Sequence, residues 1–198
     1  MSDSIILTDV LTLIIHDIIK STDEFKSFDI NKILVCCASS RRDFKGAIYG
    51  KLQPLRFKDG SEIIKHNKNY YTIPKIVLNN VEILYVLYLY IPKFFDLPAK
   101  DKINVIFHEL YHISPEFNGD IRRMSNIKSA HGHSKKSFEE KYIQYASAYF
   151  NKIHDTPFNG FLQMNFEEIE KQFNVIKYRR MKSIKAELIS SQPLSNPS

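Results

Sequence analysis

The stretch NVIFHELYHISPEFNGD, residues 104–120, places two histidines four residues apart, with a glutamate directly after the first. Residues at this spacing share one face of an α-helix, so His108 and His112 can bind one metal ion together. Glu109 lies beside them and can take a proton from a metal-activated water. The pattern His-Glu-x-x-His therefore predicts a Zn²⁺ site, and the alternative is a helix that carries two surface histidines.

A catalytic zinc ion needs a third protein ligand. The downstream segment KSAHGHSKKSFEEKY supplies His131 and His133. We expect His133 to be the ligand, because it lies closest to the helix that follows, and His131 is the alternative. A carboxylate of Asp120 or Glu116 is the remaining candidate. Asp120 is otherwise predicted to orient a ligand imidazole, a role that metal sites often give to a carboxylate.

Two helices must position these groups. The first is predicted over residues 98–113, with Asp96 as its cap and an apolar stripe that comprises Ile103, Ile106, Phe107, Leu110 and Ile113. Pro115, Asn118 and Gly119 predict a turn directly after it. Ser134 or Ser137 can cap the second helix, where Ser137 and Glu140 form a capping-box pattern. Its predicted packing residues are Phe138, Tyr142, Tyr145 and Tyr149.

The other elements predict an α+β fold. An amphipathic N-terminal helix is expected from Ser4 to Lys20, with an apolar stripe of Ile6, Val10, Leu13, Ile14 and Ile18. Strands are expected in the segments 32–38, 47–57, 70–78 and 81–92. Pro54 makes the second of these an edge strand or a bulge, and the last and most apolar is expected to be central. The adjacent Cys36 and Cys37 are expected to be core residues that point to opposite faces of their strand.

The motifs HELYH and HGHSKKSF resemble those of the zincin-type metallopeptidases of bacteria and phages and, more distantly, of SprT/Spartan-like proteases. The resemblance implies a minimal zincin-like fold: an N-terminal helix, a small mixed β-sheet, the HExxH helix and a C-terminal helix. In that pattern His108, Glu109 and His112 are followed by His133 and Phe138. It also implies that an edge strand binds an extended peptide above the zinc, and segment 47–57 is the candidate.

With 198 residues, the chain is long enough for one domain with a core. We expect residues 1–160 to form the zincin-like metallopeptidase domain. Residues 161–189 are expected to be a basic extension packed on or following that domain. Residues 190–198, which are rich in Ser and Pro, are expected to be a disordered tail.

The formal charge of +6 is compatible with an anionic partner such as nucleic acid. One group of basic residues accompanies the candidate site and comprises Arg41, Arg42, Arg122, Arg123, Lys128, Lys135 and Lys136. A second comprises Lys177, Arg179, Arg180, Lys182 and Lys185, and it follows the acidic stretch NFEEIEK, an order that also suits a helix dipole. A solvated protein surface is the simpler reading of both groups.

The chain has no cysteine pattern of a disulfide framework or a zinc ribbon, and its N-terminal apolar stretch is too short to span a bilayer. We therefore expect a cytoplasmic protein without a membrane partner. The predicted function is zinc-dependent peptide-bond hydrolysis, with a protein or peptide substrate and Glu109 as general base. The alternatives are a DNA-associated SprT-like protease or binding protein, and a zinc-binding regulatory module without turnover.

Overall fold

The computed structural model describes residues 4–39, 48–123 and 135–190, and at its centre lies a mixed three-stranded sheet. The central strand β8 (Tyr85–Ile91) runs parallel to β2 (Ile33–Ser39) and antiparallel to β3 (Gly50–Pro54). Pro54 ends the edge strand β3, and the apolar β8 is central, as predicted. The arrangement confirms a mixed α+β architecture.

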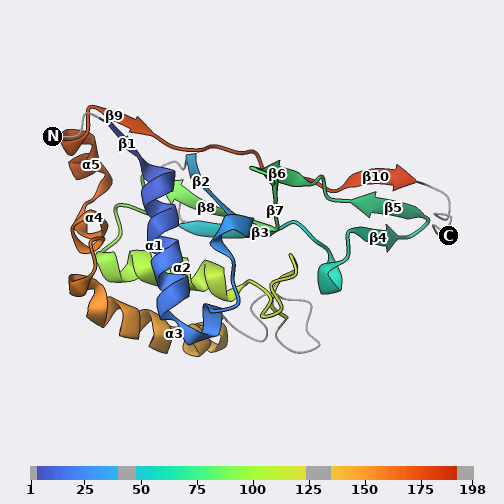
Figure 1. Ribbon diagram of the computed structural model, residues 1–198, viewed down its shortest axis with the longest axis horizontal. Helices are drawn as coiled ribbons and strands as arrows, with labels where there is room; N and C mark the ends of the chain where they lie inside the picture. Colours follow the sequence, from blue (N-terminus) through green and yellow to red (C-terminus); the bar gives the residue numbers. More distant parts are fainter. Residues whose placement is uncertain (1–3, 40–47, 124–134, 191–198) are drawn as a thin grey trace.

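The helices pack on one face of this sheet (Figure 1). The main helices are α1 (Leu7–Ser21), α2 (Ala99–Tyr111) and α3 (Lys135–Lys152), followed by the short α4 (Asn159–Gln163) and α5 (Phe166–Gln172). Because side chains alternate along a strand, Tyr85, Leu87 and Leu89 of β8 point into this helical core. Every residue of the predicted apolar stripe of α2 is fully buried there.

The other face of the sheet carries a smaller core of residues such as Leu34, Cys36 and Val86. The adjacent Cys36 and Cys37 belong to different cores, as their alternation predicted. A C-terminal strap, residues 175–190, covers this second face with Met181 and Ile184. The strap begins with β9 (Val175–Lys177), which pairs in parallel with β1 (Ser4–Ile6), and ends with β10 (Glu187–Ser190).

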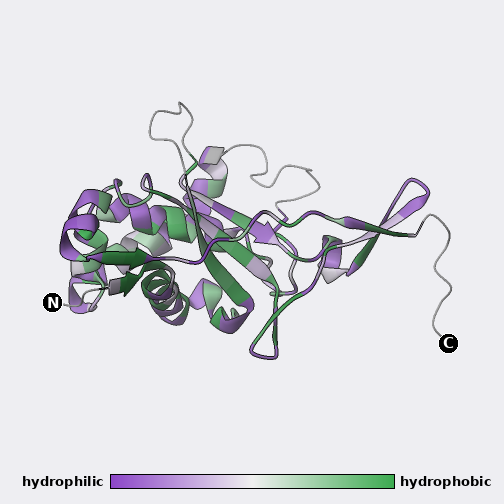
Figure 2. Ribbon diagram, turned by 90° about the horizontal axis from the view of Figure 1, so that it is seen from above, coloured by the Kyte–Doolittle hydropathy of each residue, from purple (hydrophilic) through white to green (hydrophobic). Residues whose placement is uncertain are grey.

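A three-stranded arm extends from the body (Figure 1). Strand β5 (Asn69–Thr72) pairs antiparallel with both β4 (Ile63–His66) and β10. A separate hairpin is formed by β6 (Ile76–Leu78) and β7 (Val81–Ile83). Figure 2 shows that apolar residues concentrate in the body, whereas the tip of the arm is hydrophilic. Short 3₁₀ turns complete the described chain and span Asp23–Phe25, Ile30–Lys32, Lys58–Gly60 and Ile153–Asp155.

The C-terminal helices join the main core through a buried lysine. Leu162 of α4 and Ile169 of α5 are fully buried in it. Lys102 of α2 is equally buried, and its ammonium donates to the carbonyls of Leu162 at 2.8 Å and Met164 at 2.6 Å. These carbonyls lie at the C-terminal end of α4, where no backbone donor follows in the helix, so Lys102 acts as a side-chain cap.

Several predicted elements differ in extent. Residues 4–6 form β1 instead of the first helical turn, which leaves Ile6 and Leu13 exposed while Leu7, Leu11 and Ile15 are buried. The predicted strand 70–78 is split around Pro74, which cannot donate a ladder hydrogen bond. The predicted strand 81–92 is interrupted at Leu84, whose N–H donates to the Lys32 carbonyl.

The predicted helix caps also differ. Helix α2 begins after Pro98 without a side-chain cap, and the Asp96 carboxylate accepts from the Phe166 N–H at 3.3 Å. Ser137 lies inside α3, which begins at Lys135, so it does not cap this helix and the predicted capping box with Glu140 is wrong. The alternative cap, Ser134, lies outside the described residues. A capping box is instead formed at α5 by Asn165 and Glu168.

No helix of the described chain is long and apolar enough to cross a membrane. Residues 191–198, which make up nearly all of the predicted tail, lie outside the described part, so that prediction remains untested.

Candidate metal centre

Helix α2 brings the two imidazoles together near its C-terminal end. The Nε2 atoms of His108 and His112 lie 3.1 Å apart, and the ring planes are nearly perpendicular at 86°. Two nitrogens that bind one tetrahedral Zn²⁺ at about 2.0–2.1 Å are separated by about 3.3 Å. The separation of the two Nε2 atoms is therefore close to the one that two ligands of a single ion require.

The remaining ring nitrogen of His108 is held by a residue of α3. The Tyr142 hydroxyl lies 3.2 Å from His108 Nδ1, and Tyr142 is almost completely buried. Such a contact can orient the ring so that Nε2 is the nitrogen available to a metal ion, a role that oxygen atoms around ligand histidines commonly fill. Sequence reasoning identified Tyr142 only as a packing residue. The sequence did indicate that Tyr142 lies one helical turn after Phe138 and therefore on the same face of the helix.

Phe138 holds the second imidazole. Its ring stacks on His112 with a centroid distance of 4.5 Å and an interplanar angle of 24°. Because Phe138 is fully buried in the core beside Tyr111, it restricts rotation of the His112 ring. The predicted packing role of Phe138, Tyr142 and Tyr149 is confirmed, and Tyr145 is partly buried.

Glu109 is buried between α2 and the edge strand β3, with only 6% of its surface exposed. Burial raises the pKa of its carboxyl group to about 7, and a hydrogen bond from the Leu52 backbone N–H opposes this effect. A Cβ atom on Gly50 would lie 2.8 Å from Glu109 Cγ, so β3 can approach this closely only with glycine at position 50. Sequence reasoning did not identify Gly50 as part of the site.

The turn after α2 folds the chain back onto His112. Ile113 and Ile121 form an antiparallel bridge, and the Arg122 N–H donates to the His112 carbonyl at 2.6 Å. Tyr85 of the central strand stabilises this turn, because its hydroxyl donates to the Asp120 carbonyl and accepts from the Gly119 N–H. The turn predicted from sequence is present and fixed to the sheet.

Asp120 is buried at this turn. Its carboxylate accepts from the N–H groups of Asp59 at 2.9 Å and Ile121 at 2.7 Å, and it pairs with Arg123 at 2.8 Å. These contacts brace the turn, and the role of Asp120 in orienting a ligand imidazole remains a prediction.

The two candidates for the third ligand, His131 and His133, lie outside the described residues. Within residues 4–39, 48–123 and 135–190, no three His, Cys, Asp or Glu side chains are grouped closely enough to hold a metal ion. Both described ends that border residues 124–134 contact His112, through the Arg122 N–H on one side and the Phe138 ring on the other.

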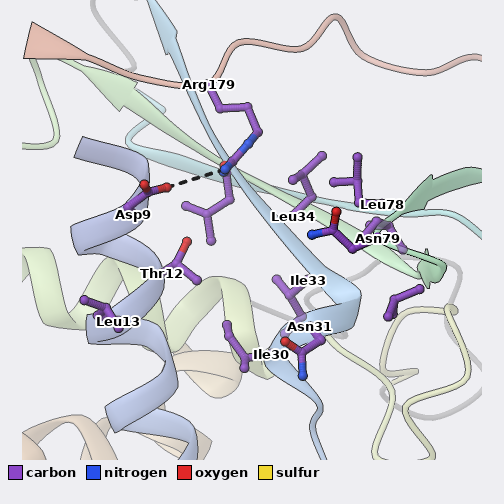
Figure 3. A pocket seen from close by; sticks show the side chains of 13 residues that line it. Asp9, Thr12, Leu13, Ile30, Asn31, Ile33, Leu34, Leu78, Asn79 and Arg179 are labelled. Carbon is purple, nitrogen blue, oxygen red and sulfur yellow. Dashed lines mark hydrogen bonds and ion pairs between the residues drawn. The ribbon is translucent and has the colours of Figure 1, made fainter. Parts of the chain in front are cut away.

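An open groove of about 460 Å³ lies elsewhere on the molecule (Figure 3). Its lining residues come from α1, segment 30–35, the β6–β7 hairpin and the strap. Arg179 and Asp9 pair at one end, 3.5 Å apart. The groove lacks the convergent imidazoles of α2, so it is not the candidate metal centre.

The sheet, helix α2 and its paired imidazoles define an α+β protein with a candidate metal-binding site. Over residues 5–155 the chain matches the model of the family described as "Putative phage metallopeptidase". Because this match covers most of the chain, the protein belongs to that family, which implies a metal ion and a protein substrate. No curated protein and no solved structure matches the chain significantly.

Proposed function

We propose that this protein is a zinc-dependent metallopeptidase whose reaction takes place beside the C-terminal end of α2. The observation that carries the proposal is the convergence of the His108 and His112 Nε2 atoms on the same helix that carries the buried Glu109. Membership of the metallopeptidase family supports the same chemistry. The zincin-like fold and the kinship to SprT-like proteases belong to this proposal as well.

Three protein ligands would hold the Zn²⁺: His108, His112 and a residue of segment 124–134. His133 is the preferred third ligand and His131 the alternative. Both precede Phe138 by a few residues in the sequence, and Phe138 stacks on His112, which supports a ligand from this segment. A bound Zn²⁺ supplies Lewis acidity, which polarises the scissile carbonyl and acidifies a water molecule.

Glu109 is the proposed general base. Its carboxylate accepts a proton from the attacking water and then delivers it to the leaving amine. A carboxyl group with a pKa of about 7 suits both steps near neutral pH, because it accepts and releases protons readily there. The Leu52 N–H holds the carboxylate at the edge of β3, within the buried space between this strand and α2.

Strand β3 is the proposed binding edge for the peptide. The Tyr49 carbonyl accepts a hydrogen bond from β8, and the Leu55 N–H donates to the residue just before β8. The backbone N–H and C=O groups of the odd-numbered residues of β3 therefore face the sheet. The backbone groups of Gly50 and Leu52 therefore face the opposite edge, beside Glu109. An extended peptide that pairs with this edge would carry its scissile bond past the carboxyl group of Glu109.

The substitution Glu109→Gln tests the proposal, because glutamine preserves the volume of the side chain but cannot accept the proton. We expect loss of peptidase activity by at least about a hundredfold with the zinc content unchanged. The activity of the variant is compared with the rate at which wild-type protein hydrolyses unfolded protein substrates. Undiminished activity in the variant would show that Glu109 is not the base.

A further inference from the structure

Positive charge is concentrated in two segments that are far apart in the sequence. Residues 63–81 and 175–190 together hold eight basic residues and one acidic residue, for a formal charge of +7. The whole chain carries +6, so all other residues sum to −1. If the net positive charge were distributed evenly over the surface, the other residues would also carry a positive net charge.

The fold joins the two segments into one surface. Strand β10 of the strap pairs with β5 of the arm, with Leu188 opposite Tyr71 (Figure 1). Before that point the strap crosses the sheet, where the Gln53 side chain binds Ser183 and Ile184 and the Tyr88 hydroxyl donates to the Lys182 carbonyl. The strap backbone is thus fixed, and its basic side chains are exposed.

Most of these cations are not neutralised. Within the described residues, no ion pair is formed by the six exposed side chains of Lys65, Lys68, Lys177, Arg180, Lys182 and Lys185. By contrast, Lys75 pairs with Glu62 at 2.6 Å and Arg179 with Asp9 at 3.5 Å. We call the six unpaired cations and the backbone that carries them the basic strip.

The sequence expectation for this region is corrected in one respect. The basic cluster 177–185 is not part of a helix, because α5 ends at Gln172, so a helix dipole does not explain it. In the cluster near the candidate metal centre, Arg122 pairs with Glu24 at 2.8 Å and Arg123 with Asp120, whereas Arg41, Arg42 and Lys128 lie outside the described residues.

We propose that the basic strip binds the phosphate backbone of a nucleic acid. Extended chain rises about 3.3 Å per residue, so Lys177, Arg180, Lys182 and Lys185 follow one another at roughly 7–10 Å. A linear series of cations at this spacing matches a linear polyanion. Aromatic rings are interleaved with the cations, as in surfaces that bind single strands: Lys65 lies 5.7 Å from the Tyr70 ring and Arg180 4.7 Å from the Tyr178 ring.

The middle of the strip lies on the face of the sheet opposite α2, because Met181 and Ile184 of the strap pack on the second core and α2 packs on the first. The start of the strap packs on the first core through Ile176 and Tyr178. Nucleic acid bound to the middle of the strip leaves the candidate metal centre accessible. The proposal therefore does not depend on peptidase activity, and binding can be measured without turnover.

The test compares two triple variants of the full chain. Lys177→Gln, Lys182→Gln and Lys185→Gln remove three charges from the strip, and Lys20→Gln, Lys100→Gln and Lys152→Gln remove three exposed charges from the ends of α1, α2 and α3. Binding of a short labelled oligonucleotide, single-stranded and duplex, is measured by fluorescence anisotropy from about 50 to 200 mM salt. Thermal unfolding midpoints confirm that both variants are folded.

We expect wild type to bind at low salt, the strip variant to bind about tenfold or more weakly, and its log–log salt slope to fall by about 2–3. The helix-end variant should remain within about twofold of wild type. Equal weakening in both variants would overturn the proposal, since net charge alone would then explain binding. So would absence of binding to wild type at about 50 mM salt, or binding to vesicles rich in phosphatidylserine without binding to the oligonucleotide.

Discussion

A Cβ atom at Gly50 would lie 2.8 Å from Cγ and 3.0 Å from Oε1 of Glu109. The edge strand β3 can therefore lie this close to the proposed base only because residue 50 is glycine. The substitution Gly50→Ala must displace the Glu109 side chain or the strand. We expect kcat/KM for peptide hydrolysis to fall by roughly 10–100-fold, because small displacements of a catalytic group are costly. Zinc content should be unchanged, since the imidazoles are not touched.

The matched control is Gly160→Ala, because a Cβ atom there meets nothing within 4 Å. Activity of this variant should equal that of wild type. If Gly50→Ala is as active as the control, the close approach of β3 to Glu109 has no catalytic importance.

The hydroxyl of Tyr142 should contribute to metal affinity. The substitution Tyr142→Phe keeps the ring against Phe138 but removes the contact with His108 Nδ1. Loss of a group that orients a metal ligand typically weakens metal binding by about 10–100-fold. Competition with a zinc chelator measures the affinity, and Tyr145→Phe on the same helix is the control. Equal zinc affinities for the two variants would rule out an orienting role.

Tyr85 should stabilise the turn that follows α2. In Tyr85→Phe, the buried Gly119 N–H loses its hydrogen-bond partner, and the Asp120 carbonyl keeps only the Ser114 N–H. We expect the free energy of unfolding to fall by about 1–3 kcal/mol, measured by urea denaturation. The control Tyr90→Phe removes a hydroxyl from a less buried residue of the same strand. A Tyr85→Phe variant as stable as this control would contradict the assigned role.

The buried Lys102 should make stability depend on pH. Burial lowers the pKa of its ammonium group from 10.5 to about 8, whereas Asp96 and Glu168 oppose the shift. Between these two values the unfolded chain binds more protons than the folded chain, so the contribution of Lys102 to stability rises with pH. Below pH 8 the lysine is charged in both states, and this gain is absent.

Comparison with Lys102→Met isolates the effect. From pH 7 to pH 10, the stability of wild type relative to the variant should increase by roughly 2–3 kcal/mol. Denaturant unfolding at several pH values measures this difference, and Lys100→Met, which removes an exposed lysine, should show no such trend. A pH-independent difference between wild type and Lys102→Met would show that Lys102 is not titrating in this range.

Sequence reasoning was most successful for features that depend on local spacing. The i, i+4 relation of His108 and His112 and the apolar stripe of α2 follow from the helical repeat alone, and the structure bears out both. The central position of β8 followed from its continuous apolar run. Tyr142 and Gly50 were missed because their contacts join elements far apart in the chain, and neither residue type indicates such a contact by itself.

The C-terminal region shows the same limit. The basic residues from 177 to 185 were visible in the sequence. Their position beside the arm depends on the pairing of β10 with β5, which lie more than a hundred residues apart in the chain. The split at Pro74 could have been anticipated, because proline interrupts a strand ladder. The conversion of residues 4–6 into a strand depends on β9, which no local pattern at the N-terminus indicates.

The central claim is a zinc site built on His108 and His112, and elemental analysis of tag-free protein tests it most directly. Wild type and Glu109→Gln should each contain about one zinc per chain, and His108→Ala and His112→Ala should contain almost none. His131→Ala and His133→Ala, measured beside them, identify the third ligand, with loss expected for His133→Ala. Wild-type protein that contains no divalent metal even after zinc is supplied would contradict the account, and HELYH would then be only part of the helical packing.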